Sequence, residues 1–306
     1  MPIPGLLLID KESDWTSHDV VAKVRGLAGT RKVGHAGTLD PMATGLLLIG
    51  VESATKLLTF LVGESKTYTA TIRLGASTVT DDREGEILQQ AAPGAVTGVT
   101  GAQIETALDA LRGEIMQVPS SVSAIKVDGQ RAYAKVRGGD EVKLAARPVT
   151  ISRFSIDAEP RIVDKQFLDL DVTVECSSGT YIRALARDLG SALGVGGHLT
   201  ALRRTHIGRY SVDQAKTLGE YQTIKQSGQD LPILPSALAA KQQFETRVLN
   251  PQEVIDIRHG KRIPADSAPK DVAIAALDES GALVAMLERS GGQLKSSVVF
   301  SEASNA

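Results

Sequence analysis

Asp40 is the residue best placed to do chemistry, because it is the one carboxylate in a glycine-rich stretch that spans residues 34–50. The glycines of this stretch permit backbone angles that side chains forbid. Pro41 fixes its own backbone angle and pushes Asp40 towards an extended conformation. The apolar run at residues 46–49 lies between glycines and is typical of a buried strand. The pattern predicts a loop that holds one carboxylate just ahead of a strand.

Simpler interpretations of this loop stay open. An Asp-Pro pair among glycines is most often a turn whose carboxylate accepts hydrogen bonds from nearby backbone N–H groups. A phosphate cradle is not indicated, because the loop has neither of the common nucleotide-binding glycine patterns. His35 and Asp40 together provide too few ligands for a metal ion. Thr38 and Thr44 are the other side chains of the loop that can hydrogen-bond.

The order His-x-Gly-Thr-Leu-Asp-Pro-x-Ala-Thr-Gly-Leu-Leu closely resembles the catalytic loop of the TruB family of tRNA pseudouridine synthases. Three more segments resemble the family, in the family's own order. They lie at residues 66–85, 176–190 and 196–208. The resemblance as a whole extends over roughly residues 5–211. The N-terminal motif matches in part: Glu12 and Asp14 stand where the family has Pro and Gly, so we expect a less rigid turn there.

The resemblance implies a role for each matching residue. Asp40 would attack C1′ or C6 of the target uridine, or remove the 2′-proton, and these routes stay open. Arg183 would pair with Asp40. Tyr68 would stack on the base, a role that suits a tyrosine at a sheet edge, and would take part in the final proton transfer. His35 would support the flipped-out nucleotide, and the pocket lining would include Tyr181 and Leu202.

The position of Arg183 predicts an ionic partner even without the family resemblance. A turn at residues 177–180 precedes a helix whose apolar positions recur at helical spacing. Arg183 lies in the first turn of this helix, where the macrodipole disfavours a cation. This position favours an anionic partner elsewhere in the fold, although a surface arginine is the alternative. For Arg203 and Arg204, RNA contact and a solvated position both stay open.

Several elements follow from local patterns. Residues 6–10 predict a strand buried on both faces, and Thr16 predicts the cap of a helix that ends near residue 27. Ser53 is expected to cap another helix, with Val62 on its apolar face. Alternation predicts strands at residues 66–74, where Tyr68 shares the apolar face, and at residues 167–176. Cys176 on that second strand is expected to be a small buried residue rather than a nucleophile.

A basic stretch lies at residues 126–153, with seven basic and three acidic side chains and therefore a net charge of +4. A solvated face would explain this charge equally well. The resemblance implies that residues from about 119 to 150 form a thumb that grips the tRNA arm, with Lys126 and Arg131 among the contacts. Phosphate neutralisation by such side chains gives salt-dependent affinity. Residues 131–137 are expected to form a short basic helix.

The composition of the chain argues against several classes of protein. The chain has 306 residues, 42% of them hydrophobic, and a net charge of −2, which argues mildly against a general nucleic-acid binder. Its one cysteine, Cys176, excludes an internal disulfide and suits a reducing cytoplasm. The N-terminus has the pattern of neither a signal peptide nor a membrane span.

The resemblance to the TruB family implies an α+β pseudouridine synthase fold, in which a mixed, largely antiparallel central sheet is flanked by helices and loops. Residues 1–211 would form the catalytic domain and 212–244 a linker. Residues 245–306 would form a small β-rich, PUA-like domain, either a truncated RNA-binding module or a stabilising appendage.

The activity that the resemblance implies is the isomerisation of uridine 55 in the T-loop of tRNA. The enzyme would flip the base, break the N1–C1′ bond, rotate the uracil and rejoin it through C5. This chemistry needs no cofactor, metal, guide RNA or obligatory protein partner, and we expect a monomer. The alternatives are a non-catalytic tRNA-binding protein, a guide-RNA-dependent synthase of the dyskerin type, and a hydrolase that uses Asp40 with His35.

Overall fold

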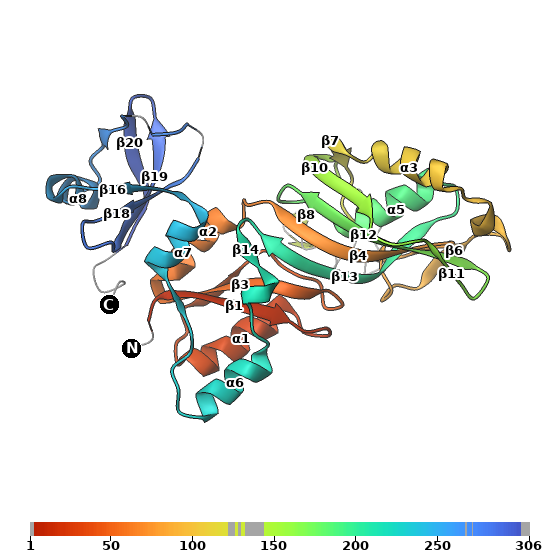
Figure 1. Ribbon diagram of the computed structural model, residues 1–306, viewed down its shortest axis with the longest axis horizontal. Coiled ribbons are helices and arrows are strands. Elements are labelled where there is room, and N and C mark those ends of the chain that lie inside the picture. The colour runs from red at the N-terminus through yellow and green to blue at the C-terminus, as the bar shows by residue number, and fades with distance from the viewer. Residues whose placement is uncertain are drawn as a thin grey trace. The chain divides into compact units, whose positions relative to one another are not determined.

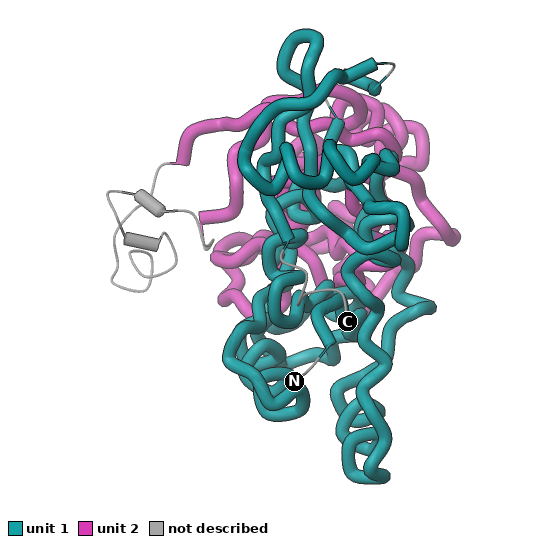
Figure 2. Tube along the Cα trace, turned by 90° about the vertical axis from the view of Figure 1, so that its left-hand side faces the viewer, with its two compact units in different colours: residues 1–64, 207–306 teal, residues 65–206 magenta. Residues whose placement is uncertain are grey.

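A computed structural model describes residues 3–121, 126–127, 130–131, 144–266, 268–270 and 272–300, of which 126–127 and 130–131 are described only along the backbone. The chain divides into two compact units (Figure 2). Unit 1 comprises residues 1–64 and 207–306, and unit 2 comprises residues 65–206. Figure 1 labels their elements.

Unit 1 is built on the antiparallel strands β1 (Gly5–Lys11) and β3 (Thr44–Val51). Successive side chains of β1 enter different apolar clusters: Leu6 and Leu8 join one, whereas Leu7 joins another. This confirms the expected strand that is buried on both faces, since neighbouring residues of a strand point in opposite directions. Two short strands also pair with them: β2 (Val33–Ala36) pairs with β3, and β15 (Leu234–Pro235) pairs with β1.

Helix α1 (Ser17–Ala28) covers one of these faces together with α6 (Leu218–Gln226). Thr16 and Asp19 form a capping box at its start, and Gly29 ends it in the left-handed conformation with φ +67°. The expected cap and the expected end of this helix are therefore confirmed.

The helix predicted after Ser53 is different in the structure. A 3-10 turn, η1 (Glu52–Lys56), contains Ser53, and the α-helix α2 covers only Leu58–Leu61. The cap predicted at Ser53 was wrong: its hydroxyl is buried and has no hydrogen-bond partner among the described residues. Val62, expected on the apolar face, is 41% exposed.

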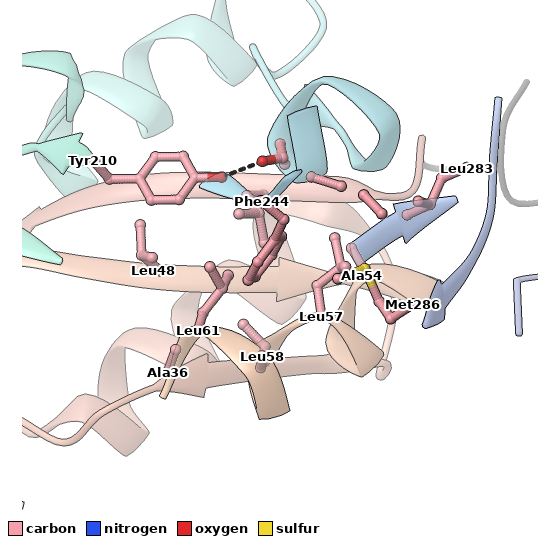
Figure 3. Close-up of a cluster of buried hydrophobic side chains, with 14 of the residues drawn as sticks. Ala36, Leu48, Ala54, Leu57, Leu58, Leu61, Tyr210, Phe244, Leu283 and Met286 are labelled. Carbon is pink, nitrogen blue, oxygen red and sulfur yellow. Dashed lines mark hydrogen bonds between the residues drawn. The ribbon is translucent and has the colours of Figure 1, made fainter. Parts of the chain in front are cut away.

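The C-terminal part of unit 1 is a five-stranded sheet in the order β16-β18-β19-β20-β17, with helix α8 (Pro251–Arg258). Its strands are β16 (Glu245–Val248), β17 (Ile263–Pro264), β18 (Ile274–Leu277), β19 (Leu283–Ser290) and β20 (Gln293–Val299). Figure 3 shows Leu283 and Met286 of β19 in one apolar cluster with Leu48 and Phe244. The C-terminal sheet is β-rich, as expected, and it shares a core with the N-terminal strands.

The stretch at residues 212–244, expected as a linker, contains a 3-10 turn (Val212–Gln214) and the helices α6 and α7 (Ser236–Gln243). Tyr210, in the short strand β14 (Tyr210–Ser211), donates a hydrogen bond from its hydroxyl to the Ala239 carbonyl at 2.7 Å (Figure 3). The domain boundaries at residues 211 and 245 stay predictions.

Unit 2 contains a largely antiparallel sheet in the order β13-β4-β12-β10-β7. Its strands are β13 (Gly197–Ile207, to residue 206 in this unit), β4 (Lys66–Leu74), β12 (Phe167–Cys176), β10 (Arg147–Ile156) and β7 (Gly113–Gln117), with β11 (Arg161–Val163) paired to β12. Both alternating strands run over the residues predicted for them. The predicted edge position of Tyr68 was wrong, because β4 lies between two other strands.

The remaining elements of unit 2 are short. They are β5 (Ala76–Thr78), β6 (Ile87–Gln90), the 3-10 turn η2 (Ala95–Gly98), α3 (Gly101–Asp109), the hairpin strands β8 (Lys126–Val127) and β9 (Gln130–Arg131), and α5 (Ile182–Ala192). Within the part of the chain that the structure describes, no helix is long and apolar enough to cross a membrane.

Candidate active site

The Asp40 loop connects β2 to β3 in unit 1. Asp40 is half-buried, and its carbonyl accepts a hydrogen bond from the Ala43 backbone N–H at 3.1 Å, which closes a tight turn over Pro41. Gly37 and Gly45 flank this turn with φ values of +81° and +98°, in the region that favours glycine. The loop is therefore shaped by its own sequence and delivers Asp40 from a fixed turn.

Lys11, the last residue of β1, is hydrogen-bonded to this turn. Its side chain is buried with 1% exposure, and its ammonium donates hydrogen bonds to three carbonyls. The acceptors are Glu12 at 2.9 Å, Trp15 at 2.7 Å and Pro41 at 3.1 Å. The backbone N–H of Asp14 also bonds the Pro41 carbonyl, at 2.9 Å. The N-terminal motif thus clamps the residue next to Asp40.

Asp14 occupies the position where the family has glycine, and its φ of +70° is left-handed. The turn therefore keeps a glycine-like backbone with a non-glycine residue, which costs strain. A buried role for Lys11 was not predicted. The signal that could have found it is its place two residues after the apolar run at residues 6–9, within the same strand.

Two further contacts fix the loop to α1. The Leu39 backbone N–H donates to the Ser17 hydroxyl at 2.9 Å, and that hydroxyl lies 3.2 Å from the Leu39 carbonyl. The ring of His35, on β2, packs edge-on against His18 with ring centroids 5.7 Å apart. His35 therefore comes from the strand that precedes the loop, and Asp40 from the turn that follows it.

In unit 2, Arg183 lies in the first turn of α5 and is 5% exposed. Its guanidinium donates a hydrogen bond to the Thr80 carbonyl at 2.8 Å and lies 3.5 Å from the Asp82 carboxylate. Burial of this cation at a helix N-terminus requires such anionic and carbonyl partners. Asp82 is thus an anionic partner of the kind that the position of Arg183 indicated.

Asp82 is itself fixed within the turn that follows β5. One oxygen of its carboxylate accepts the Thr80 hydroxyl at 2.5 Å and the Glu84 backbone N–H at 3.0 Å. Its carbonyl accepts the Thr78 hydroxyl at 2.8 Å. The other carboxylate oxygen faces Arg183. Asp82 lies in the segment 66–85 that resembles the family, but the sequence indicated no role for this carboxylate.

A second buried carboxylate, Asp81, adjoins the first. Burial raises the pKa of Asp81, and the Ser120 hydroxyl and the guanidinium groups of Arg187 and Arg183 oppose this effect. Its side chain accepts the Ser120 hydroxyl at 2.5 Å and pairs with Arg187 at 3.2 Å. Sequence reasoning missed Ser120 and Arg187, because their partners are distant along the chain.

The other predicted pocket residues also lie in unit 2. Tyr68, on β4 opposite Val174, is 7% exposed, and Leu202, on β13, is 7% exposed. Tyr181 forms the N-cap of α5. Arg204 is 1% exposed, so the solvated position considered for it was wrong, and its contact with RNA stays a prediction.

Lys126 and Arg131 are backbone partners in the hairpin of β8 and β9. Their side chains lie outside the described residues, as do residues 132–137 of the basic helix expected at 131–137. Arg131, the expected first residue of that helix, lies in β9 instead. Cys176 is 2% exposed, and burial raises the pKa of its thiol to about 11, which confirms its role as a small core residue. No cluster of three or more His, Cys, Asp or Glu side chains in the described ranges is arranged to hold a metal ion.

The structure therefore gathers the predicted residues into two sets. His35 and Asp40 belong to unit 1, whereas Tyr68, Tyr181, Arg183 and Leu202 belong to unit 2. The predicted pairing of Asp40 with Arg183 joins the two units and stays a prediction.

Comparison with solved structures identifies the fold. A structure of an H/ACA RNP bound to a substrate RNA containing 2′-deoxyuridine matches with a TM-score of 0.70 and 23% identity, over 97% of this chain and 85% of that chain. A Cbf5-Nop10-Gar1 complex matches with a TM-score of 0.70 and 24% identity, over the same shares. At this identity the likeness shows the fold alone.

Family models define the class. Residues 25–182 match the TruB family pseudouridylate synthase N-terminal domain. Residues 183–233 match the tRNA pseudouridylate synthase B C-terminal domain, and residues 244–301 match the tRNA pseudouridine synthase II C-terminal model. The class is therefore that of the pseudouridylate synthases.

Relatives that match over nearly the whole chain identify the family within this class. A protein of Arthrobacter sp. (strain FB24) is 57% identical over 97% of both chains. One of Paenarthrobacter aurescens (strain TC1) is 55% identical over 97% of this chain and 95% of its own, and one of Mycobacterium leprae (strain TN) is 52% identical over 97% and 91%. All three are named tRNA pseudouridine synthase B. The chain belongs to the TruB family.

Proposed function

We propose that this chain isomerises uridine 55 in the T-loop of tRNA to pseudouridine. The observation that carries the proposal is the full-length similarity to relatives named tRNA pseudouridine synthase B, combined with an Asp40 loop that its own unit holds rigidly. The reaction breaks the N1–C1′ bond and forms a C5–C1′ bond. N1 gains a proton and C5 loses its hydrogen to solvent, so the product is an isomer of the substrate.

Asp40 is the reacting carboxylate in this proposal. It attacks C1′ or C6, or it removes the 2′-proton, and the half-buried turn presents it for any of these routes. Lys11 and Ser17 keep the turn in place through the carbonyl of Pro41 and the backbone of Leu39. A nucleophile on a preorganised turn reacts faster because less orientational entropy is lost in the transition state.

In this proposal, Arg183 donates a charge-assisted hydrogen bond to Asp40, and this bond keeps the carboxylate ionised and oriented. Support comes from its burial and its fixed partners, which leave the guanidinium few alternative positions. Tyr68 stacks on the base and serves in the final proton transfer at C5. His35 supports the flipped nucleotide, while Tyr181 and Leu202 line the pocket.

The substrate in this proposal is the T-arm of a free tRNA, bound without guide RNA or an obligatory protein partner by a monomer. The thumb at about residues 119–150, with Lys126 and Arg131, contributes phosphate contacts. The reaction takes place in the cytoplasm, whose reducing conditions suit a chain with a single cysteine. The proposal also places domain boundaries at residues 211 and 245.

The experiment measures tritium release from tRNA labelled at C5 of uridine, with protein alone and no guide RNA. Wild type is compared with Asp40→Asn and with Asp230→Asn, an exposed carboxylate of the same unit that serves as the matched control. We expect wild type and the control to release about one tritium per tRNA, and Asp40→Asn to release none while tRNA affinity stays within several-fold. A transcript with cytidine at position 55 should give no release.

Release from the position-55 variant transcript would contradict the assigned site. No release from wild type, with tight tRNA binding intact, would favour a non-catalytic tRNA-binding protein and leave Asp40 as a turn residue. Activity that appears only with an added guide RNA would favour the guide-dependent class. Replacement of Lys126 and Arg131 by Ala should weaken binding and flatten its salt dependence, and an unchanged salt slope would remove the thumb from the proposal.

A further inference from the structure

Helix α5 carries two arginines one turn apart, and they meet different carboxylates of the segment that follows β5. Arg187 also pairs with Asp188 of its own helix at 2.8 Å. Arg183 and Arg187 are four residues apart, so they lie on the same face of the helix. Arg183 lies 3.5 Å from Asp82, and Arg187 lies 3.2 Å from Asp81. The two adjacent acidic residues after β5 are thereby paired with arginines on two successive helical turns of α5. This double pairing restricts both the rotation and the rise of α5 relative to the turn.

The segment that leaves β7, residues 117–121, forms what we call the β7 strap, and it binds the same two elements. Gln117 uses both ends of its amide on the backbone of Tyr181: its oxygen accepts the Tyr181 N–H at 2.9 Å and its nitrogen donates to the Tyr181 carbonyl at 3.1 Å. Tyr181 forms the N-cap of α5 but makes no side-chain capping bond. Gln117 therefore holds the start of this helix.

The strap also closes onto the second ion pair. The Ser120 hydroxyl donates to the Asp81 carboxylate at 2.5 Å, and Arg187 donates from its other terminal nitrogen to the Val118 carbonyl at 2.7 Å. Gln117 and Ser120 are 2% and 0% exposed, and Asp81 is 7% exposed. The Arg187 side chain is 28% exposed, so the buried part of the network is formed by Gln117, Ser120 and Asp81. Such a network is rigid when every member is satisfied, and the loss of one member leaves the buried partners with a desolvation cost.

We infer that Gln117, Ser120, Asp81 and Arg187 are positioning residues of the isomerisation. They hold the turn from Tyr181 to Arg183 in register with the Asp81–Asp82 turn and do not touch the reacting atoms. The inference rests on the proposed function, in which Tyr181 and Arg183 meet the target nucleotide and Asp40. A misplacement of about 1 Å in such a group can cost about 100-fold in rate, which makes a rigid support of this turn consequential.

The test separates positioning from stability. Gln117→Leu removes both bonds to the Tyr181 backbone, Arg187→Gln removes the charge opposite Asp81, and Ser120→Ala is the mildest change. The matched control is Arg73→Gln, which breaks another ion pair of unit 2: Arg73 bonds both oxygens of Asp169, at 2.7 and 2.8 Å, between β4 and β12. Each variant is measured for Tm, tRNA affinity and the single-turnover rate of tritium release with enzyme in excess, at a temperature well below every Tm.

We expect Gln117→Leu and Arg187→Gln to lower the single-turnover rate by about 10- to 100-fold with tRNA affinity within about threefold. Arg187→Lys should recover part of this loss, because it restores a cation opposite Asp81. Arg73→Gln should lower Tm while its rate stays within about twofold of wild type. If Gln117→Leu or Arg187→Gln does not fold, Ser120→Ala carries the test with an expected loss of about threefold or more.

Rates within twofold of wild type in the strap variants, with a lowered Tm, would overturn the inference, since these residues would then only stabilise the fold. A loss of tRNA affinity as large as the loss of rate would also overturn it. An inactive wild type is a separate outcome, because it would refute the proposed function before any variant is compared.

Discussion

Replacement of Lys11 by methionine should destabilise the protein and reduce its activity more than any other single lysine change in unit 1. Lys11→Met keeps the length and most of the volume of the side chain but removes the ammonium. Three carbonyls lose their donor in this variant, those of Glu12, Trp15 and Pro41. The Pro41 carbonyl keeps the backbone N–H of Asp14.

The magnitude follows from these bonds. A buried acceptor left without its donor costs about 1 to 3 kcal/mol, so the two carbonyls that keep no donor among the described residues, those of Glu12 and Trp15, would cost about 2 to 6 kcal/mol together. Methionine also removes a buried charge, and the recovered desolvation penalty of several kcal/mol offsets part of that cost. We expect a net loss of about 2 to 4 kcal/mol in the free energy of unfolding.

Urea unfolding of wild type and variant measures this loss, with tritium release as the functional readout. Lys56→Met is the matched control, since the Lys56 ammonium donates to one carbonyl, that of Val299, and the bond is exposed. The control should lose no more than about 1 kcal/mol and keep its activity. A Lys11→Met protein within about 1 kcal/mol of wild type and fully active would refute the clamp on the Asp40 turn.

Three further predictions follow from single residues. Asp14, at φ +70°, should tolerate Gly within about 0.5 kcal/mol, whereas the β-branched Asp14→Val should lose about 1 to 2 kcal/mol; the opposite order in urea unfolding would contradict strain at this turn. Tyr210→Phe removes the hydroxyl bond to the buried Ala239 carbonyl and should cost about 1 to 2 kcal/mol, and an unchanged stability would refute that contribution. Burial raises the pKa of the Cys176 thiol from 9.0 to about 11, so the reactive thiolate is scarce until the pH approaches that value; at pH 8 its fraction should be roughly 100-fold smaller, and iodoacetamide should label the native protein at least that much more slowly than the urea-unfolded chain. Equal labelling rates would contradict the buried position.

Several features of the site could not be predicted because their partners are far apart along the chain. Lys11 bonds Pro41 across 30 positions, Ser120 bonds Asp81 across 39, and Arg187 pairs with Asp81 across 106. The residue types alone do not reveal which distant polar groups meet. Arg204 shows the same limit, because a cation in a sequence is expected to be solvated and the fold buries it to 1% exposure.

The sequence by itself determined the local elements and the candidate chemistry. Alternation over residues 66–74 and 167–176 and the capping box at Thr16 depend on neighbours within a few positions, so they survive in any fold that buries one face. The Asp40 loop was recognisable because its glycines and proline constrain the backbone locally. Only the tertiary structure decided which groups hold that loop and the start of α5, and that the C-terminal sheet shares a core with the first strands. The physical reason is that burial and hydrogen-bond satisfaction are properties of distant segments brought together, and no window of sequence contains both partners.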